Sequence, residues 1–199
     1  MTDTITNNFL KKVSNKPILL VGPTASGKSK FAMSLAIKLE RQIVNADSLQ
    51  VYNNWRILTA RPTSEDEAII QHHLYGHKAP DEEYSVGHWL RELSGILNTN
   101  KNLIIVGGTG LYFTALTEGL VNIPKISNKV KTMGKKKLND MGVASLLKDL
   151  DNETLENLDT KNPMRVVRAW EVFQETGKSL KRWHSETEPA ILPLSDCHP

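Results

Sequence analysis

The chain of 199 residues is long enough for one sizeable domain, or for one domain with a smaller appendage. Its 39% hydrophobic and 24% charged residues are ordinary for a globular protein, and a net charge of +3 excludes a polycation. No run approaches the ~18 apolar residues of a membrane span. The single cysteine, Cys197, cannot form an internal disulfide, and Met1–Lys16 lacks a signal-peptide pattern. We therefore expect a cytoplasmic protein with no membrane partner.

Short apolar runs and helical periodicity alternate in the first part of the chain. A helix is expected from Lys28 to about Arg41, with Phe31, Leu35 and Leu39 on its packed face, and another ends near Glu118. The three apolar runs predict buried parallel strands at residues 17–21, 43–46 and 103–106. Strands that alternate with helices indicate an α/β sheet.

The second part of the chain is rich in lysine and has a helical pattern. Six lysines and no acid lie between Lys125 and Lys137, a run that could attract a polyanion but is more often only solvated surface. Asn162-Pro163 predicts a helix start and Gly177 a helix stop. A shared apolar face of this helix would be made by Val166, Val167, Trp170 and Phe173.

Residues 22–29 read GPTASGKS and directly follow the first predicted strand, which is the pattern of a phosphate-binding loop. Its glycines let backbone amides turn toward an anion, and the following helix adds its partial positive charge. Lys28 would neutralise phosphate oxygens, and the Ser29 hydroxyl could join the shell of a Mg²⁺ ion. The anion-binding residues are predicted to be Gly22, Pro23, Thr24, Ala25, Ser26, Gly27, Lys28 and Ser29.

Two further polar segments follow predicted strands. Asp47 stands at the end of the second strand, where it could cap a turn, accept a proton or bind a metal. Gly107–Gly110 follows the third strand and could form a second anion-binding turn or a simple tight turn, in which only Thr109 has a polar side chain. Because ligands bind beyond the carboxyl ends of parallel strands, all three segments are expected at one edge of the sheet.

Three histidines, His72, His73 and His77, raise the possibility of a metal site. Neither cysteine nor an acidic residue recurs at ligand spacing beside them. We interpret them as surface or packing residues.

Several segments together resemble one protein family, the tRNA dimethylallyltransferases (tRNA isopentenyl transferases). They are GPTASGKS, NADSLQVY, LTARPTSEDE, HHLYGH, YSVGHW, VGGTGLYF and NPMRVVRAWEVFQETGK, in that order, between about residues 17 and 182. The resemblance implies that the loop holds dimethylallyl diphosphate, and that the dimethylallyl group moves to N6 of adenosine 37 of tRNA. Mg²⁺ is the implied cofactor, and a monomer is expected.

The resemblance also implies roles for individual residues. Asp47 would hydrogen-bond the N6 amine and take its proton, while Thr24, Lys28 and Thr109 would contact the substrate as further catalytic residues. Gln50 would reach a base edge of the RNA. The remaining implied contacts with tRNA are Asp47, Ser48, Leu49, Thr109, Lys131, Met164, Arg165, Val166, Val167 and Arg168, with Lys129 and Lys135–Lys137 as phosphate contacts.

The implied fold is a P-loop NTPase-like parallel sheet flanked by helices, with a helical tRNA-binding extension. We divide it into a core at 1–120, a lysine-rich tRNA-binding segment at 121–162, and a return helix of the core with a tail at 163–199. Family members continue past this point, so the resemblance implies a chain truncated at its C-terminus. Residues 191–199, ILPLSDCHP, match no motif of the family that we can place.

Three alternatives stay open. A small-molecule kinase or NTPase would use the same loop, but it leaves DSLQVY and GGTGLY without a role. A transferase acting on a free adenine nucleotide would not need the basic segments. A truncated form could bind tRNA or diphosphate without turnover.

Overall fold

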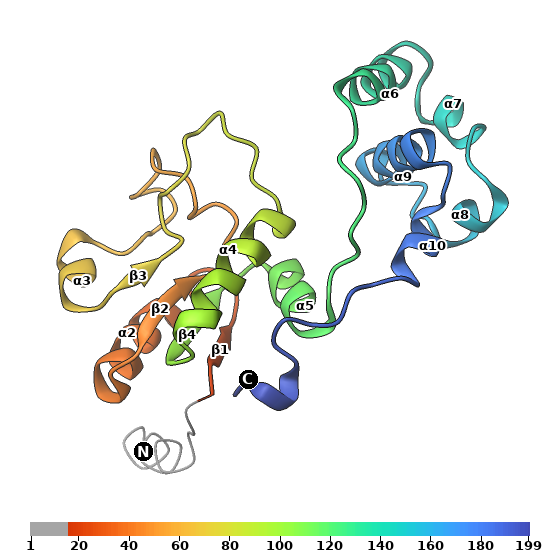
Figure 1. The fold of residues 1–199 in the computed structure, drawn as a ribbon. Helices are drawn as coiled ribbons and strands as arrows, with labels where there is room; N and C mark the ends of the chain where they lie inside the picture. Colours follow the sequence, from red (N-terminus) through yellow and green to blue (C-terminus); the bar gives the residue numbers. More distant parts are fainter. Residues whose placement is uncertain (1–15) are drawn as a thin grey trace. The chain divides into compact units, whose positions relative to one another are not determined.

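The computed structural model describes residues 16–199, and Met1–Asn15, where no signal peptide is predicted, lie outside the described residues. Two compact units make up the chain (Figure 1). The first contains the residues up to Gly119 together with 189–199, and the second contains residues 120–188. No helix among the described residues is long and apolar enough to cross a membrane.

A four-stranded parallel sheet forms the centre of the first unit, as predicted. The three predicted strands are present, and the two-residue β3 was missed because its histidines give no apolar signal. In order across the sheet, the strands are β1 (Ile18–Val21), β4 (Leu103–Gly107), β2 (Gln42–Asn45) and β3 (His72–His73).

Helix α2 (Lys28–Leu39) follows the phosphate-binding loop and packs on the sheet. The prediction that Phe31 belongs to its packed face is wrong, since that side chain is 48% exposed. Ala32, Leu35 and Ala36 are buried instead, because the small alanines let the helix lie close to the strands. Their partners across the interface are Ile18, Ile43, Ile104 and Val106.

The opposite face of the sheet is covered by α4 (Val86–Thr99), which runs across it in Figure 1. Trp89 of this helix is fully buried and donates its indole N–H to the carbonyl oxygen of Asn45, at 2.7 Å. Tyr112 of α5 (Gly110–Glu118) stacks on the Trp89 ring, with centroids 4.6 Å apart. A short helix, α3 (Ser64–Ile69), precedes β3 and begins with a capping box at Thr63.

The carboxyl end of β4 lies very close to the end of β2. A Cβ atom placed on Gly107 would lie 2.1 Å from the carbonyl oxygen of Ala46, so only glycine fits there. Backbone bonds close the same edge: Ala46 N–H donates to Val106, and Thr109 N–H donates to Ala46. The contact fixes where the segments after β2 and β4 leave the sheet.

The tail of the chain returns to the outer edge of the sheet. His198 pairs in parallel with Ile18, and Leu19 N–H donates to the His198 carbonyl at 2.7 Å. The preceding 3₁₀ turn spans Leu194–Asp196, and burial raises the pKa of the Cys197 thiol. The tail therefore covers the start of β1.

The second unit is helical. Its longest helices, α6 and α9, pack on one another around Trp170, against which Gly134 of α6 lies closely. As predicted, α9 begins after an Asn162 cap with proline at its first position and ends at Gly177. The helices are α6 (Asn128–Met141), α7 (Val143–Leu147), α8 (Asn152–Asn157), α9 (Pro163–Thr176) and α10 (Leu180–His184).

The observed units divide the chain differently from the three predicted segments. Helix α9 packs with α6 and α7 in the second unit, whereas it was predicted as a return helix of the core. Residues 189–199 belong to the first unit. The apolar face of α9 was correctly identified from sequence, but its periodicity does not say which partner covers that face.

Replacing Gly107 tests the close approach of β4 and β2. We expect Gly107→Ala to lower the free energy of unfolding by roughly 1–3 kcal/mol, because the added methyl group must push back the Ala46 backbone. Urea unfolding of the full chain measures this. Gly95→Ala is the matched control: it sits in α4 with open space around its Cβ position, and we expect it to add roughly 0.5–1 kcal/mol. Equal effects of the two substitutions would contradict the argument.

Candidate active site

Three polar segments meet at the carboxyl edge of the sheet, as the sequence predicts. A Cβ atom placed on Gly108 would lie 3.3 Å from the Gly22 carbonyl oxygen, 3.7 Å from Asp47 Oδ2 and 3.9 Å from Lys28 Nζ. One atom-sized position thus touches the phosphate-binding loop, the residue after β2 and the turn after β4. A cation and a carboxylate oxygen both face this position.

The phosphate-binding loop has the backbone of an anion-binding turn. Ala25 has φ +64° and Gly27 has φ +83°, so two alternate residues of the loop adopt the left-handed conformation. For alanine this costs about 1–2 kcal/mol, strain of a kind that is concentrated at ligand sites. Lys28 Nζ donates to the Pro23 carbonyl at 3.0 Å, which keeps its ammonium group over the loop. Thr24 and Ser29 are exposed to solvent at the same mouth.

Asp47 is held rigidly, with one carboxylate oxygen turned toward the loop. Its backbone N–H donates to Asn45 Oδ1 at 2.8 Å, and its Oδ1 accepts from Leu49 N–H at 2.9 Å. Asn45, which is fully buried, also donates to the carbonyl oxygens of Asp47 and Leu74. Oδ2 is the oxygen nearest Gly108, so it is the one placed to accept a proton.

Thr109 joins the turn after β4 to the segment after β2. Its Oγ1 accepts from Ser48 N–H at 3.0 Å and donates to Ser48 Oγ at 3.4 Å. The hydroxyl therefore positions the Asp47 segment, in addition to any contact with a ligand.

Gln50, which was predicted to reach a base edge, is hydrogen-bonded within the chain. Its side-chain amide donates to the carbonyl oxygen of Thr59 at 2.7 Å, which ties down the loop at 55–61. Arg61 holds the other side of this loop by donating to the Tyr52 carbonyl. The donor end of Gln50 is thus engaged within the chain, while Leu49 beside it is 56% exposed.

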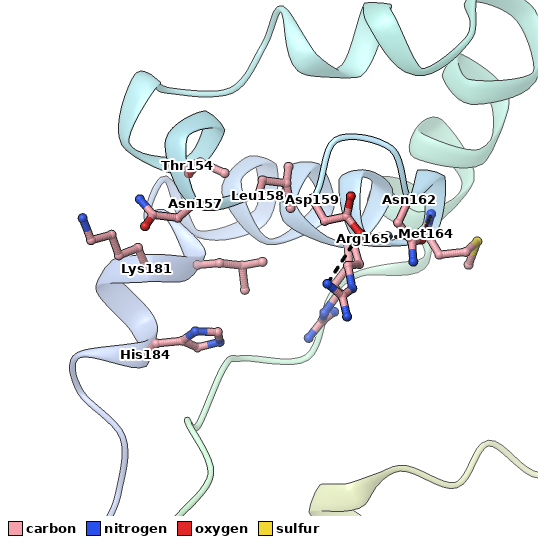
Figure 2. A pocket seen from close by; sticks show the side chains of 11 residues that line it. Thr154, Asn157, Leu158, Asp159, Asn162, Met164, Arg165, Lys181 and His184 are labelled. Carbon is pink, nitrogen blue, oxygen red and sulfur yellow. Dashed lines mark hydrogen bonds and ion pairs between the residues drawn. The ribbon is translucent and has the colours of Figure 1, made fainter. Parts of the chain in front are cut away.

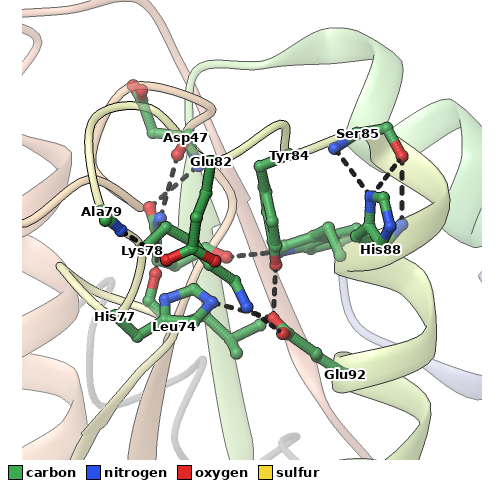
Figure 3. Close-up of polar contacts among 12 residues, drawn as sticks. Asp47, Leu74, His77, Lys78, Ala79, Glu82, Tyr84, Ser85, His88 and Glu92 are labelled. Atoms are coloured by element: carbon green, nitrogen blue, oxygen red, sulfur yellow. Dashed lines mark hydrogen bonds and ion pairs between the residues drawn. The ribbon is translucent and has the colours of Figure 1, made fainter. Parts of the chain in front are cut away.

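A cluster around Glu92 fixes the segment that contains His77, Lys78 and Tyr84 (Figure 3). The Glu92 carboxylate accepts from Tyr84 Oη at 2.6 Å, from His77 Nε2 at 2.9 Å and from Lys78 Nζ at 3.0 Å. Burial raises the pKa of Glu92, but hydrogen bonds from these three donors outweigh it and lower the pKa overall. The sequence carries no signal for Glu92, since its partners are 8 to 15 residues away along the chain.

Tyr112 and His73 stay neutral near this edge. Burial, with the nearby Tyr52 and Asp47, raises the pKa of Tyr112 to about 12. Burial and the neighbouring His72 lower the pKa of His73, whose Nε2 lies 2.8 Å from Gln42 Oε1. His72 Nδ1 bonds the Ile70 carbonyl, so the side chains of both β3 histidines bond within the chain.

The predicted RNA-contacting residues of α9 divide into two sets. Val166 and Val167 are buried in the core of the second unit, so their side chains stabilise the fold. Met164, Arg165 and Arg168 are exposed on the helix surface. Of the predicted residues of α9, only this second set can contact RNA through its side chains.

The lysines of α6 also divide. Lys137 pairs with Asp149 and lies over the Trp170 ring, so it takes part in the fold of the second unit. Lys131 is half-buried. Exposed ammonium groups that remain on this helix are those of Lys129, Lys135 and Lys136.

Comparison with known proteins places the chain in a family. Residues 50–196 match the family model described as IPP transferase, and residues 16–74 match one described as isopentenyl transferase. The chain belongs to the IPP transferase family. The match reaches residue 196 and so includes most of the tail, in which the sequence showed no motif that could be placed.

The relatives of this family member are considerably longer than the chain. A tRNA dimethylallyltransferase of Cereibacter sphaeroides is 50% identical over 92% of the chain and 58% of the relative, and one of Dinoroseobacter shibae is 49% identical over 92% and 62%. Among solved structures, a eukaryotic dimethylallyltransferase acting on tRNA superimposes with a TM-score of 0.73 at 26% identity, over 92% of this chain and 47% of that one. A tRNA isopentenylpyrophosphate transferase of Bacillus halodurans superimposes with a TM-score of 0.51 at 31% identity, over 83% of this chain and 57% of that one.

The link between Thr109 and Ser48 can be tested by substitution. We expect Thr109→Val to lower the free energy of unfolding by roughly 1–3 kcal/mol, because the half-buried Ser48 N–H loses its acceptor. Thr109→Ser keeps the hydroxyl and should lose less than half as much. Chemical unfolding of both variants measures this. Equal losses of stability would contradict a specific role for the Thr109 hydroxyl.

The Glu92 cluster predicts a loss of stability in acid. Because the folded pKa of Glu92 lies below its unfolded value of about 4.3, its stabilisation is complete above that pH and is lost as the pH falls through the folded pKa. We expect Glu92→Gln to be less stable at pH 7 and to show a flatter dependence between about pH 5 and 3. Unfolding midpoints across this range measure the difference, and parallel curves would contradict the assignment.

Proposed function

We propose that this chain carries the catalytic edge of a tRNA dimethylallyltransferase. The observation that carries the proposal is the convergence of Lys28, Asp47 Oδ2 and Gly108 at one position of the sheet edge. The names of the relatives support it, since those proteins are called tRNA dimethylallyltransferases. Cytoplasmic location and a monomeric state stay predictions from the sequence.

In the proposed reaction, the loop binds the diphosphate of dimethylallyl diphosphate. The amides of the loop and the Lys28 ammonium group stabilise the negative charge that grows on the departing diphosphate. The bond between the allylic carbon and the diphosphate oxygen breaks, and its electron pair leaves with diphosphate. The same carbon forms a bond to N6 of adenosine 37 of tRNA, and Asp47 Oδ2 accepts the N6 proton.

Mg²⁺ fits the donor set at the loop. Mg²⁺ commonly uses one or two protein oxygens together with substrate phosphates, and Ser29 offers an exposed hydroxyl at the first turn of α2. When bound, the ion would supply further positive charge for the leaving group.

The basic residues favour RNA over a free adenine nucleotide as the acceptor. The second unit exposes Arg165 and Arg168 on α9 and three lysines on α6, a distribution that suits several phosphates of a polymer. Association with tRNA should therefore weaken steeply as the salt concentration rises.

Two substitutions separate the proposed roles of Asp47 and Lys28. We expect Asp47→Asn to slow single-turnover transfer to tRNA by about 10²–10⁴-fold, because the proton acceptor is lost, while binding of dimethylallyl diphosphate persists. Lys28→Ala should weaken that binding by about tenfold or more. Rapid-quench assays and equilibrium binding with Mg²⁺, in the absence of ATP, measure the two effects.

The outcomes distinguish the proposal from its alternatives. A transfer rate unchanged by Asp47→Asn would remove Asp47 from the proton-transfer step. Tight ATP binding by the loop, together with phosphoryl transfer to a small molecule, would favour the hypothesis of a small-molecule kinase.

A further inference from the structure

A cleft of about 580 Å³ lies in the second unit, formed by α8, the loop that follows it, the first turns of α9, and α10 (Figure 2). Its size is within the range of small-molecule sites. The residues of this cleft all belong to the second unit, whereas the phosphate-binding loop belongs to the first. The reaction proposed above therefore gives this cleft no role.

A buried hydroxyl group in the wall of the cleft lacks a partner. Thr154 is only 4% exposed, and its Oγ1 has no hydrogen-bond partner among the described residues. Its backbone N–H is satisfied by Asp151, which caps α8, so the side chain is not needed for the cap. An unpaired buried hydroxyl costs about 1–3 kcal/mol, and a ligand with a polar edge would supply the missing bond.

The charge around the cleft favours an anion. Arg165, Arg168, Lys181 and His184 line it, and Asp159, paired with Arg165 at 3.7 Å, is the only acidic residue of its lining. Glu153, outside the lining, pairs with the exposed Lys181 at 3.8 Å. Arg168 makes no ion pair or hydrogen bond through its guanidinium group within the part of the chain that the structure describes. The cleft also lies at the N-terminus of the 14-residue α9, where the helix dipole favours negative charge.

Part of the remaining wall is apolar and part is formed by Asn157 and Asn162. A simple anion would not need the apolar part. Leu158 and Leu180, both partly buried, line the cleft together with the exposed Met164. An apolar surface with one buried hydroxyl and several peripheral cations matches a nucleotide, whose base has flat apolar faces and a polar edge. Proteins that recognise RNA commonly bind unstacked bases of single-stranded loops in this way.

We propose that this cleft binds one unstacked nucleotide of the tRNA loop, with its base between Leu158 and Leu180, a polar base edge on Thr154 Oγ1, and its phosphate on Arg168 and Lys181. This nucleotide differs from the reacting adenosine, which goes to the sheet edge of the first unit. The inference rests on the proposed function, because it requires that the chain binds tRNA.

The test measures binding of the full chain to an anticodon stem-loop RNA at constant salt, with each loop nucleotide made abasic in turn. We expect an abasic site at one position to weaken binding by about tenfold, within the range measured for single bases. Thr154→Val should weaken binding of the unmodified RNA by about 2–10-fold, the loss of one hydrogen bond. The same abasic site should then reduce the RNA affinity of the Thr154→Val variant by a smaller factor than it reduces the affinity of the original chain.

Stability separates this role from a structural one. Because Thr154→Val removes an unpaired hydroxyl and keeps the shape, the urea midpoint should stay the same or rise while RNA affinity falls. Thr114→Val, on the exposed surface of α5 in the first unit, is the matched control and should change RNA affinity less than twofold.

Each remaining outcome is informative. If the original chain binds the RNA but every abasic site has the same effect, the inference is overturned and the proposed function stands. If the chain does not bind the RNA at all, both fail. If adenosine monophosphate alone shows the dependence on Thr154 and the RNA does not, the cleft is a site for free nucleotides and the inference is again overturned.

Discussion

The contact between Gly107 and the Ala46 carbonyl is the constraint on which the rest of the candidate active site depends. In a parallel sheet all strands end at the same edge, so the segments after β1, β2 and β4 leave from neighbouring points. The absence of a side chain at Gly107 lets the ends of β2 and β4 come together. Thr109 can then bond Ser48, and the Asp47 carboxylate comes to face the same position as Lys28.

Around this contact, each polar group that would touch substrate is held by groups that would not. The Asn45 side chain accepts a hydrogen bond from the Asp47 N–H, and Trp89 of α4 donates to the Asn45 carbonyl oxygen. Glu92, one turn further along α4, binds Tyr84, His77 and Lys78 and so fixes the segment that precedes α4. A positioned carboxylate needs less reorganisation during proton transfer, which is how such supporting bonds contribute to rate.

The second unit shows a related separation of roles within single helices. Trp170 in the core of this unit packs against Gly134, and its indole N–H binds Asp149, which also pairs with Lys137. On α9, the valines face this core, while Arg165 and Arg168 face solvent and the cleft. One helix thus builds the fold with one face and offers basic groups with the other, as expected for an amphipathic helix.

Much of the fold and site could be predicted from sequence because their signals are local. Three buried strands, the phosphate-binding loop and the capped α9 each follow from a few consecutive residues. Phe31 was misplaced because four-residue spacing does not distinguish the packed face from its neighbour, and the alanines beside it carry little apolar signal. The bond of Gln50 to Thr59, the Glu92 cluster and the unpaired Thr154 hydroxyl depend on which segments meet in space, which no single stretch of sequence encodes.

The most direct test of the account is a transfer assay with the unaltered chain, undermodified tRNA, radiolabelled dimethylallyl diphosphate and Mg²⁺, without ATP. The account predicts label on N6 of adenosine 37, located by nuclease mapping, and its loss when that adenosine is replaced by guanosine. Label that appeared on free adenine nucleotides but not on tRNA would contradict it. So would a chain that transfers no label and binds ATP more tightly than dimethylallyl diphosphate.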